Sequence, residues 1–302
     1  MPRLADNSST IAPLSGLVQS LTVKRQRTLL DDIGRALHTP VVYVKAAWAD
    51  PVLFYGRGER VGTDIDLLVH PARFEAFAAE LVRAGYTRAT FDHHLATNDA
   101  FRAWVFHAPE GFLTLDLHRA LANEPWFELR TTDLLARSAL YDSPDGPIRS
   151  LHVCDQIVYA AAHYANHVFN LDERHIHDVE LLITRFPIDW ELVVRRAKAA
   201  YLDIALRLLV AVLRSRGVTV PREPFQCDLA TRTRMLWLKK FIATESRFER
   251  VWPIQSKRWA DRFDAVALMP MISTRHAALP KFLGTYVVNR AQDLRRRSAG
   301  VG

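Results

Sequence analysis

Apolar positions in the N-terminal part of the chain follow two different periods. Residues 17–37 and 71–86 place apolar side chains at helical spacing, and the second segment begins with a proline and ends close to a glycine. Residues 40–48 (PVVYVKAAW) and 63–69 (TDIDLLV) are short aliphatic runs typical of buried strands. The pattern predicts the order helix, strand, strand, helix. The apolar face of the helix at 71–86 is expected to comprise Phe74, Phe77, Ala78, Leu81 and Val82.

Two further strand patterns follow. Residues 101–108 (FRAWVFHA) and 112–121 (FLTLDLHRAL) are joined by a Pro-Glu-Gly turn, which predicts a β-hairpin. Helices and strands in this order predict an α/β unit with a mixed sheet.

The second half of the chain has helical periodicity. A turn-rich segment, SPDGP at 143–147, separates it from the first half and is a plausible domain boundary. The expected helices cover residues 151–170, 172–186, 189–201 and 202–217. Beyond them we expect a mainly helical remainder with three tryptophans packed inside, Trp237, Trp252 and Trp259. The predicted fold class is α+β, with an N-terminal helical segment at 1–34, a core domain at 35–142 and a helical domain at 148–302.

Two aspartates interrupt the strand at 63–69. Because side chains alternate between the faces of a strand, Asp64 and Asp66 point to the same face, and the aliphatic Ile65, Leu67 and Val69 point to the other. The same alternation places Asp116 on one face of its strand, together with Thr114 and His118. If the two strands are neighbours in one sheet, three carboxylates converge.

Such a group of charges requires compensation. Two carboxylates about 5 Å apart repel by roughly 3 kcal/mol at an effective dielectric constant near 20. One interpretation is structural: Asp64 caps the strand, while Asp66 and Asp116 meet arginines. The third aspartate in a separate strand favours a divalent cation instead, and carboxylates without a cysteine partner favour Mg²⁺ or Mn²⁺ over zinc.

Three segments, VKAAW, GTDIDLLV and LTLDLHRAL, together resemble the DNA polymerase β-type nucleotidyltransferase superfamily. In more detail the chain is similar to the bacterial uncharacterised nucleotidyltransferase family, and the similarity extends to the helical segment AAHYANHVFNLDERHIHDVELLI. The family has an Asp-x-Asp strand and a third aspartate in a later strand. The resemblance covers roughly residues 35–220.

The resemblance implies a role for each matching residue. Asp64 and Asp66 would bind two metal ions, and Asp116 would complete the second site and help to activate the acceptor hydroxyl. Lys45 matches the family's lysine and would contact the triphosphate, whereas Ala46 stands where the family usually has glycine.

The turn before the aspartates adds four candidate binding residues. Arg57 and Arg60 can clamp phosphates through bidentate hydrogen bonds, although solvated loop arginines are an equal interpretation. Gly62 and Thr63 directly precede the acidic pair, where a tight turn would aim it.

The implied reaction is the Mg²⁺- or Mn²⁺-dependent transfer of a nucleoside monophosphate from an NTP, expected to be ATP, with release of pyrophosphate. The acceptor is left open between a small molecule, tRNA or other RNA, and a protein. A nucleotide-binding pseudo-enzyme with a regulatory role, favoured by Ala46, is the alternative.

The histidine-rich segment offers a second alternative, an HD-type metal phosphohydrolase. It would use His163, the pair His177-Asp178, and Asp189 or Asp203, but His163 lies too close to the pair for that fold. We prefer packing roles for His167, His175 and His177. His163 would pack between helices and hydrogen-bond Asp178, or these two residues would instead reach the nucleotide.

Composition and charge bear on the expected partners and cellular location of the protein. The net charge of +7 suits polyanionic partners such as nucleotides or RNA, and equally a basic surface without such a role. The two cysteines have no metal-binding or redox spacing, no segment has the pattern of a signal peptide, and no apolar run is long enough for a bilayer. We therefore expect a cytoplasmic protein without a membrane partner.

Overall fold

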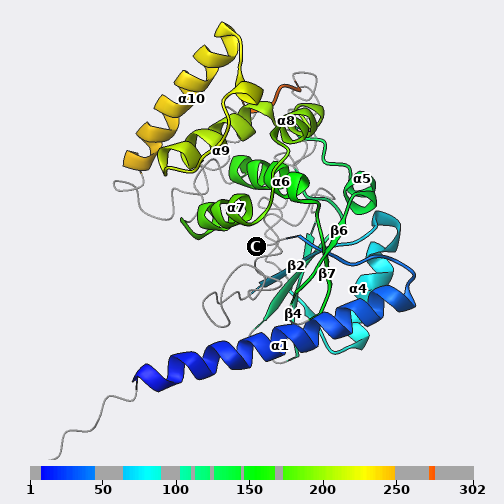
Figure 1. The fold of residues 1–302 in the computed structure, drawn as a ribbon. Helices are drawn as coiled ribbons and strands as arrows, with labels where there is room; N and C mark the ends of the chain where they lie inside the picture. The colour runs from blue at the N-terminus through cyan, green and yellow to red at the C-terminus, as the bar shows by residue number, and fades with distance from the viewer. Residues whose placement is uncertain are drawn as a thin grey trace, which may run out of the picture. The chain divides into compact units, whose positions relative to one another are not determined.

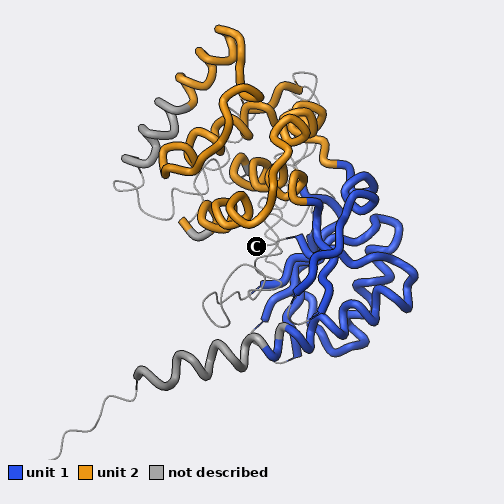
Figure 2. The backbone as a smooth tube through the Cα atoms, in the orientation of Figure 1, with its two compact units in different colours: residues 1–91, 101–121, 130–152 blue, residues 92–100, 122–129, 153–302 orange. Residues whose placement is uncertain are grey.

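The computed structural model describes residues 8–44, 64–89, 103–109, 113–122, 126–143, 146–166, 173–248 and 272–275. The chain divides into two compact units (Figure 2). Unit 1 consists of residues 1–91, 101–121 and 130–152, and unit 2 of residues 92–100, 122–129 and 153–302. The described strands all belong to unit 1, whereas the regular elements described in unit 2 are helices.

A mixed sheet organises unit 1. Its strands are β1 (Val42–Tyr43), β2 (Asp64–Leu68), β3 (Thr87–Arg88), β4 (Ala103–His107), β5 (Thr114–His118), β6 (Ala139–Tyr141) and β7 (Ile148–Ser150). Their order across the sheet is β3-β4-β5-β2-β1-β7-β6. The pairs β2–β5 and β1–β7 are parallel and the others antiparallel. The mixed sheet, the β4–β5 hairpin and the α+β fold class are thereby confirmed.

Two helices cover one face of this sheet (Figure 1). They are α1 (Ser8–Ala36) and α4 (Phe74–Arg83), and α4 is entered through the short helix η1 (Pro71–Arg73). Side chains from α1, α4, β2 and β5 form one hydrophobic core, which includes Leu30, Ile33, Phe77, Leu81, Ile65, Leu67, Leu115 and Leu117. Because alternate residues of β2 and β5 are committed to this core, the intervening residues face the other side of the sheet.

Helix α4 shows how local sequence sets the element ends. The N–H of Ala72 donates to His70 Nδ1 at 3.2 Å in the turn that leads into the helix. The chain leaves the helix through Gly85 with φ of +92°, a conformation that side chains with a Cβ rarely adopt. Leu81 is fully buried, but Val82 is 55% exposed, so its predicted place on the apolar face is wrong. A straight helix turns about 100° per residue, which carries Val82 out of the core.

All four predicted ranges of the second half contain a helix. They are α6 (Val153–Asn166), α7 (Glu173–Arg185), α8 (Trp190–Ala199) and α9 (Asp203–Ser215). Three further short or late helices are α5 (Thr131–Ala136) in unit 1, and η2 (Glu223–Phe225) and α10 (Leu229–Phe248) in unit 2. Trp237 on α10 is 48% exposed, which contradicts its expected packing inside, and Trp252 and Trp259 lie outside the described residues.

Buried charges in unit 2 are paired. Asp155 on α6 accepts a hydrogen bond of 2.9 Å from Arg196 on α8, and Arg207 on α9 donates to Asp203 at 2.9 Å and to the carbonyl of Phe225 at 2.6 Å. Such pairing is the condition for keeping ionised groups in a helical core. Across the described part of the chain, no helix combines the length and the apolar character needed to cross a membrane.

Adjacent substitutions on α4 test the arrangement of the core. Leu81→Ala should lower the free energy of unfolding by about 2–5 kcal/mol, because it leaves a cavity in the core. Val82→Ala should change it by no more than about 0.5 kcal/mol, because that side chain lies at the surface. Urea denaturation of both variants measures the difference. Equal losses would contradict the placement of α4 on the sheet.

Candidate functional site

The register of the sheet brings two aspartates together. Strands β2 and β5 are parallel neighbours, and Asp66 is paired with Asp116 across them. Asp64 lies one pair away, opposite Thr114. The expectation that the two strands are neighbours is confirmed, and the two aspartates occupy directly opposed positions at the centre of the sheet.

The aspartates lie on the face opposite the helices α1 and α4. On β5 the buried residues Leu115 and Leu117 alternate with the half-buried Thr114, Asp116 and His118. On β2, Asp64 is half-buried, whereas Asp66 is only 4% exposed. A carboxylate that is so well shielded from water needs specific polar partners.

His118 is one such partner. Its Nε2 atom lies 3.0 Å from Oδ1 of Asp66. One ligand atom from each of Asp66, Asp116 and His118 lies within 4.8 Å of the other two. No role was predicted for His118, although the strand alternation that places Asp116 on this face also places His118 there.

The donor set fits a divalent cation. Carboxylate oxygens are ligands for Mg²⁺ and Mn²⁺, and an imidazole is tolerated by Mn²⁺ and other transition metals. Asp66 and Asp116 supply oxygens from adjacent strands, and Asp64 is two residues before Asp66 on the same face. This face of the sheet can therefore hold a cation between two backbone segments that the sheet keeps in fixed register.

The other predicted binding residues, Lys45, Arg57, Arg60, Gly62 and Thr63, lie outside the described residues. Their roles remain predictions. The chain immediately before Lys45 is described: the N–H of Val44 donates to the carbonyl oxygen of Asp66 at 3.0 Å. The exit of β1 is thus hydrogen-bonded to the backbone of Asp66.

The histidine-rich segment does not form a comparable group among the described residues. His177 is half exposed and interacts with Glu180 at 3.1 Å, while the Asp189 carboxylate accepts the N–H of Leu192 at the start of α8. Asp203 binds Arg207. The ring of His163 packs 5.3 Å from that of His175, centre to centre, between α6 and α7. Within the described ranges, the Asp66, Asp116 and His118 group alone has three potential metal ligands this close.

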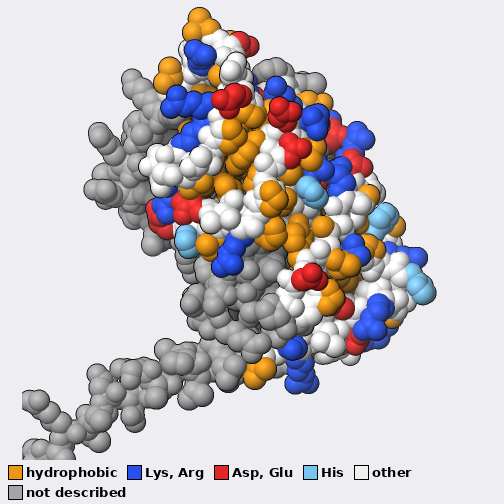
Figure 3. Space-filling model, in the orientation of Figure 1, with side chains coloured by type: hydrophobic (Ala, Val, Ile, Leu, Met, Phe, Trp, Pro, Cys, Tyr) orange, Lys and Arg blue, Asp and Glu red, His pale blue; other side chains and the backbone are white. Residues whose placement is uncertain are grey.

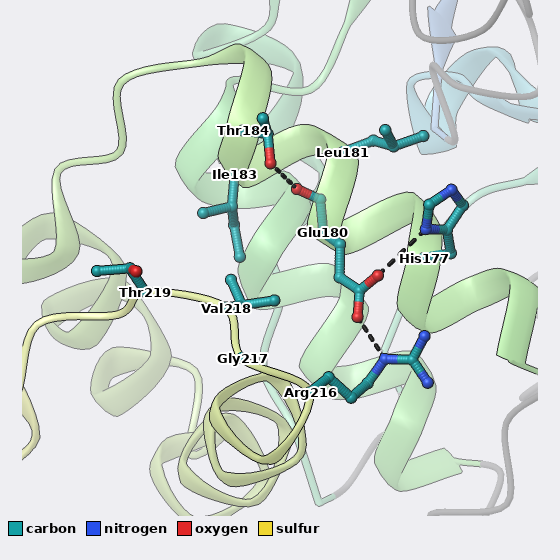
Figure 4. A pocket seen from close by; sticks show the side chains of 9 residues that line it. All are labelled: His177, Glu180, Leu181, Ile183, Thr184, Arg216, Gly217, Val218 and Thr219. Atoms are coloured by element: carbon teal, nitrogen blue, oxygen red, sulfur yellow. Dashed lines mark hydrogen bonds and ion pairs between the residues drawn. The ribbon is translucent and has the colours of Figure 1, made fainter.

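A separate pocket of about 500 Å³ lies on unit 2, between α7 and the segment that follows α9 (Figure 4). Glu180 accepts hydrogen bonds from Arg216 and His177, and Arg216 also binds Glu173. Partial burial raises the pKa of Glu180, but these hydrogen bonds outweigh it and hold the pKa below its ordinary value. The ion pairs of Arg216 with Glu173 and Glu180 therefore link α7 to the end of α9.

Lysine and arginine side chains do not gather in one patch on the face drawn in Figure 3. They are interspersed there with aspartate and glutamate. The described residues of this face therefore show no continuous basic patch.

In unit 1, a mixed sheet carries opposed aspartates on one face and helices on the other. The model of the family described as uncharacterised nucleotidyltransferase matches residues 20–216, well over half of the chain. The chain belongs to this family. The matched range includes all three aspartates as well as helices α6 to α9.

Comparison with solved structures finds proteins of related description. The solution structure of the antibiotic-resistance factor ANT(2'')-Ia is 17% identical, with 66% of this chain and 94% of that chain covered and a TM-score of 0.41. The lincomycin-bound lincosamide antibiotic adenylyltransferase LnuA is 13% identical, with 54% and 97% covered and a TM-score of 0.38. An antigenic nucleotidyltransferase-like protein from Paracoccidioides brasiliensis is 14% identical, with 66% and 90% covered and a TM-score of 0.44. No curated protein matches the chain.

Repulsion between the carboxylates of Asp66 and Asp116 should lower the free energy of unfolding of the metal-free protein. Asp116→Asn removes one of two neighbouring negative charges, so we expect unfolding in EDTA to require about 1–3 kcal/mol more than in the wild type. Mg²⁺ should raise the melting temperature of the wild type and raise that of the variant less. Asp142→Asn, at an exposed aspartate after β6, is the control. A lower melting temperature in Asp116→Asn, with equal stabilisation by Mg²⁺, would contradict this geometry.

The ion pairs of Glu180 predict a pH dependence of stability. Because its folded-state pKa is lowered, ionised Glu180 stabilises the fold above the unfolded-state pKa of about 4.3, and this contribution is lost as the pH falls through the folded-state value. Glu180→Gln should therefore be less stable than the wild type near neutral pH, and the difference should shrink in acid. Urea denaturation at a series of pH values measures it, with Glu191→Gln on α8 as the matched substitution. A difference that does not change with pH would contradict the role of the charge.

Proposed function

We propose that the protein transfers a nucleoside monophosphate from an NTP, with ATP as the expected donor, to a hydroxyl group of an acceptor. The observation that carries the proposal is the direct pairing of Asp66 with Asp116 across β2 and β5, with Asp64 on the same face. Family membership supports the same reaction class. The catalytic domain is assigned to residues 35–142.

Asp64, Asp66 and Asp116 are the residues that would hold Mg²⁺ or Mn²⁺. When bound, the cation supplies positive charge that neutralises the triphosphate and the developing charge on the phosphoryl oxygens. The contribution of the protein is the fixed separation of the carboxylates, because their strands are hydrogen-bonded to each other and packed on a hydrophobic core.

In the proposed chemical step, the acceptor hydroxyl oxygen is the nucleophile. This oxygen forms a bond to the α-phosphorus, the bond from that phosphorus to the bridging oxygen breaks, and pyrophosphate leaves with the bonding electrons. The hydroxyl proton passes to the carboxylate of Asp116, which acts as general base. Lys45, Arg57 and Arg60 would contact the phosphates. Gly62 and Thr63 would form the turn that aims the acidic pair.

The acceptor belongs to one of three classes: a small molecule, RNA, or a protein side chain. We place the reaction in the cytoplasm, because Cys154 and Cys227 are both free thiols, as is usual in a reducing compartment. The competing function is that of a pseudo-enzyme, favoured by Ala46 at a position where close approach of phosphate to the backbone suits glycine.

Transfer is tested by incubating the purified protein with Mg²⁺, each α-labelled NTP in turn, and a cell extract separated into small-molecule, RNA and protein fractions. Label in one fraction identifies the nucleotide and the acceptor class. Asp64→Asn and Asp66→Asn should each lower transfer by roughly a hundredfold or more, because each removes charge and a ligand from the site. Asp142→Asn should transfer as the wild type does.

Each alternative outcome has a defined meaning. A transfer rate equal to that of the wild type in either Asp64→Asn or Asp66→Asn contradicts the assignment of the site. Mg²⁺-dependent nucleotide binding without label in any fraction supports the pseudo-enzyme. Absence of nucleotide binding contradicts both.

A further inference from the structure

We propose that His118 is a positioning residue that orients the carboxylate of Asp66 for the divalent cation. The inference rests on the proposed function and deepens it. His118 would not bind the cation itself but would act by orienting Asp66, one of the three aspartates.

The contact crosses the sheet diagonally. In the register of β2 and β5, His118 is paired with Leu68, yet its ring reaches back toward Asp66. Both side chains lie on the same face, because Asp66 is two residues from Leu68 and the side-chain period of a strand is two. The Nε2–Oδ1 distance is 3.0 Å, and the side chains of His118 and Asp66 are only 14% and 2% exposed.

The chemistry of this contact gives His118 a donor role. An ionised carboxylate only accepts hydrogen bonds, so the proposed contact uses the imidazole tautomer with its proton on Nε2, the nitrogen that faces Asp66. A protonated nitrogen has no lone pair for a metal ion. In this arrangement Nε2 of His118 therefore binds the aspartate and not the cation, although it belongs to the same group of closely spaced ligand atoms.

Holding Asp66 in one orientation serves cation binding. A hydrogen bond to Oδ1 restricts rotation of the carboxylate and thereby sets the direction of both oxygens. The cation then meets an aspartate that is already ordered and need not lose that freedom on binding. Partners of metal ligands that act in this way typically contribute 10- to 100-fold in metal affinity.

The test measures binding of Mn²⁺ alone to the full chain by electron paramagnetic resonance, without nucleotide. His118→Ala should raise the dissociation constant about 10- to 100-fold. His118→Gln should recover most of this loss, because the amide nitrogen of glutamine can replace Nε2 as a donor at a similar distance from the backbone. His107→Ala, at an exposed histidine of the neighbouring strand β4, is the matched control and should bind as the wild type does.

Catalysis provides a second readout. If His118 acts by positioning Asp66, the metal concentration for half-maximal transfer rises in His118→Ala, while the rate at saturating Mn²⁺ stays within a few-fold of the wild type. Thermal unfolding of each variant, recorded in parallel, identifies any loss that comes from misfolding.

The outcomes separate this inference from the proposed function. Unchanged Mn²⁺ affinity in His118→Ala, together with lost affinity in Asp66→Asn, overturns the positioning role and leaves the site intact. Equal losses in the folded alanine and glutamine variants overturn it in favour of direct ligation. If neither the wild type nor Asp66→Asn binds Mn²⁺ even with nucleotide present, the proposed function fails as well.

Discussion

The close approach of Asp66 and Asp116 is the constraint on which the rest of the structure depends. Two carboxylates on adjacent strands repel each other, so the fold must supply the energy that keeps them together. It does so through the hydrogen bonds of the β2–β5 pair and through the aliphatic residues that alternate with the aspartates. Burial of these residues against α1 and α4 contributes about 1.5–3 kcal/mol for each large side chain. The favourable free energy of burying the apolar core thus offsets the repulsion between the aspartates on the opposite face of the sheet.

The two faces of the sheet therefore have separate tasks. One face is apolar and is covered by helices of the same unit (Figure 1). The other carries Asp64, Asp66 and Asp116, and successive residues of β5 alternate between the two faces. In unit 2, buried charge is neutralised within the protein, as Asp155 and Arg196 show. On the sheet, Asp66 is likewise paired, with His118, and Asp116 lies directly opposite it on the neighbouring strand.

The sequence predicted the elements whose periodicity is strong and missed what depends on tertiary contact. The helices of unit 2 and the β4–β5 hairpin follow from local pattern, as does the sharing of one face by Asp64 and Asp66. Exposure of Val82 and Trp237 could not be predicted, because an apolar side chain at the edge of a helical stripe is buried only if a neighbour covers it. The contact of His118 with Asp66 was equally out of reach, since it depends on the register of two strands far apart in the chain.

The parallel pairing of β2 with β5 also has a consequence for folding kinetics. Parallel neighbours cannot be joined by a tight turn, and here α4 and the strands β3 and β4 intervene between them. The pair between β1 and β7 spans still more of the chain. Closing such long loops costs entropy before any contact compensates it, so contacts of this kind tend to form late. The proposed ability to bind a cation would then appear only once β2 and β5 have paired, so cation binding would report this long-range pairing and not the earlier formation of the helices and the β4–β5 hairpin.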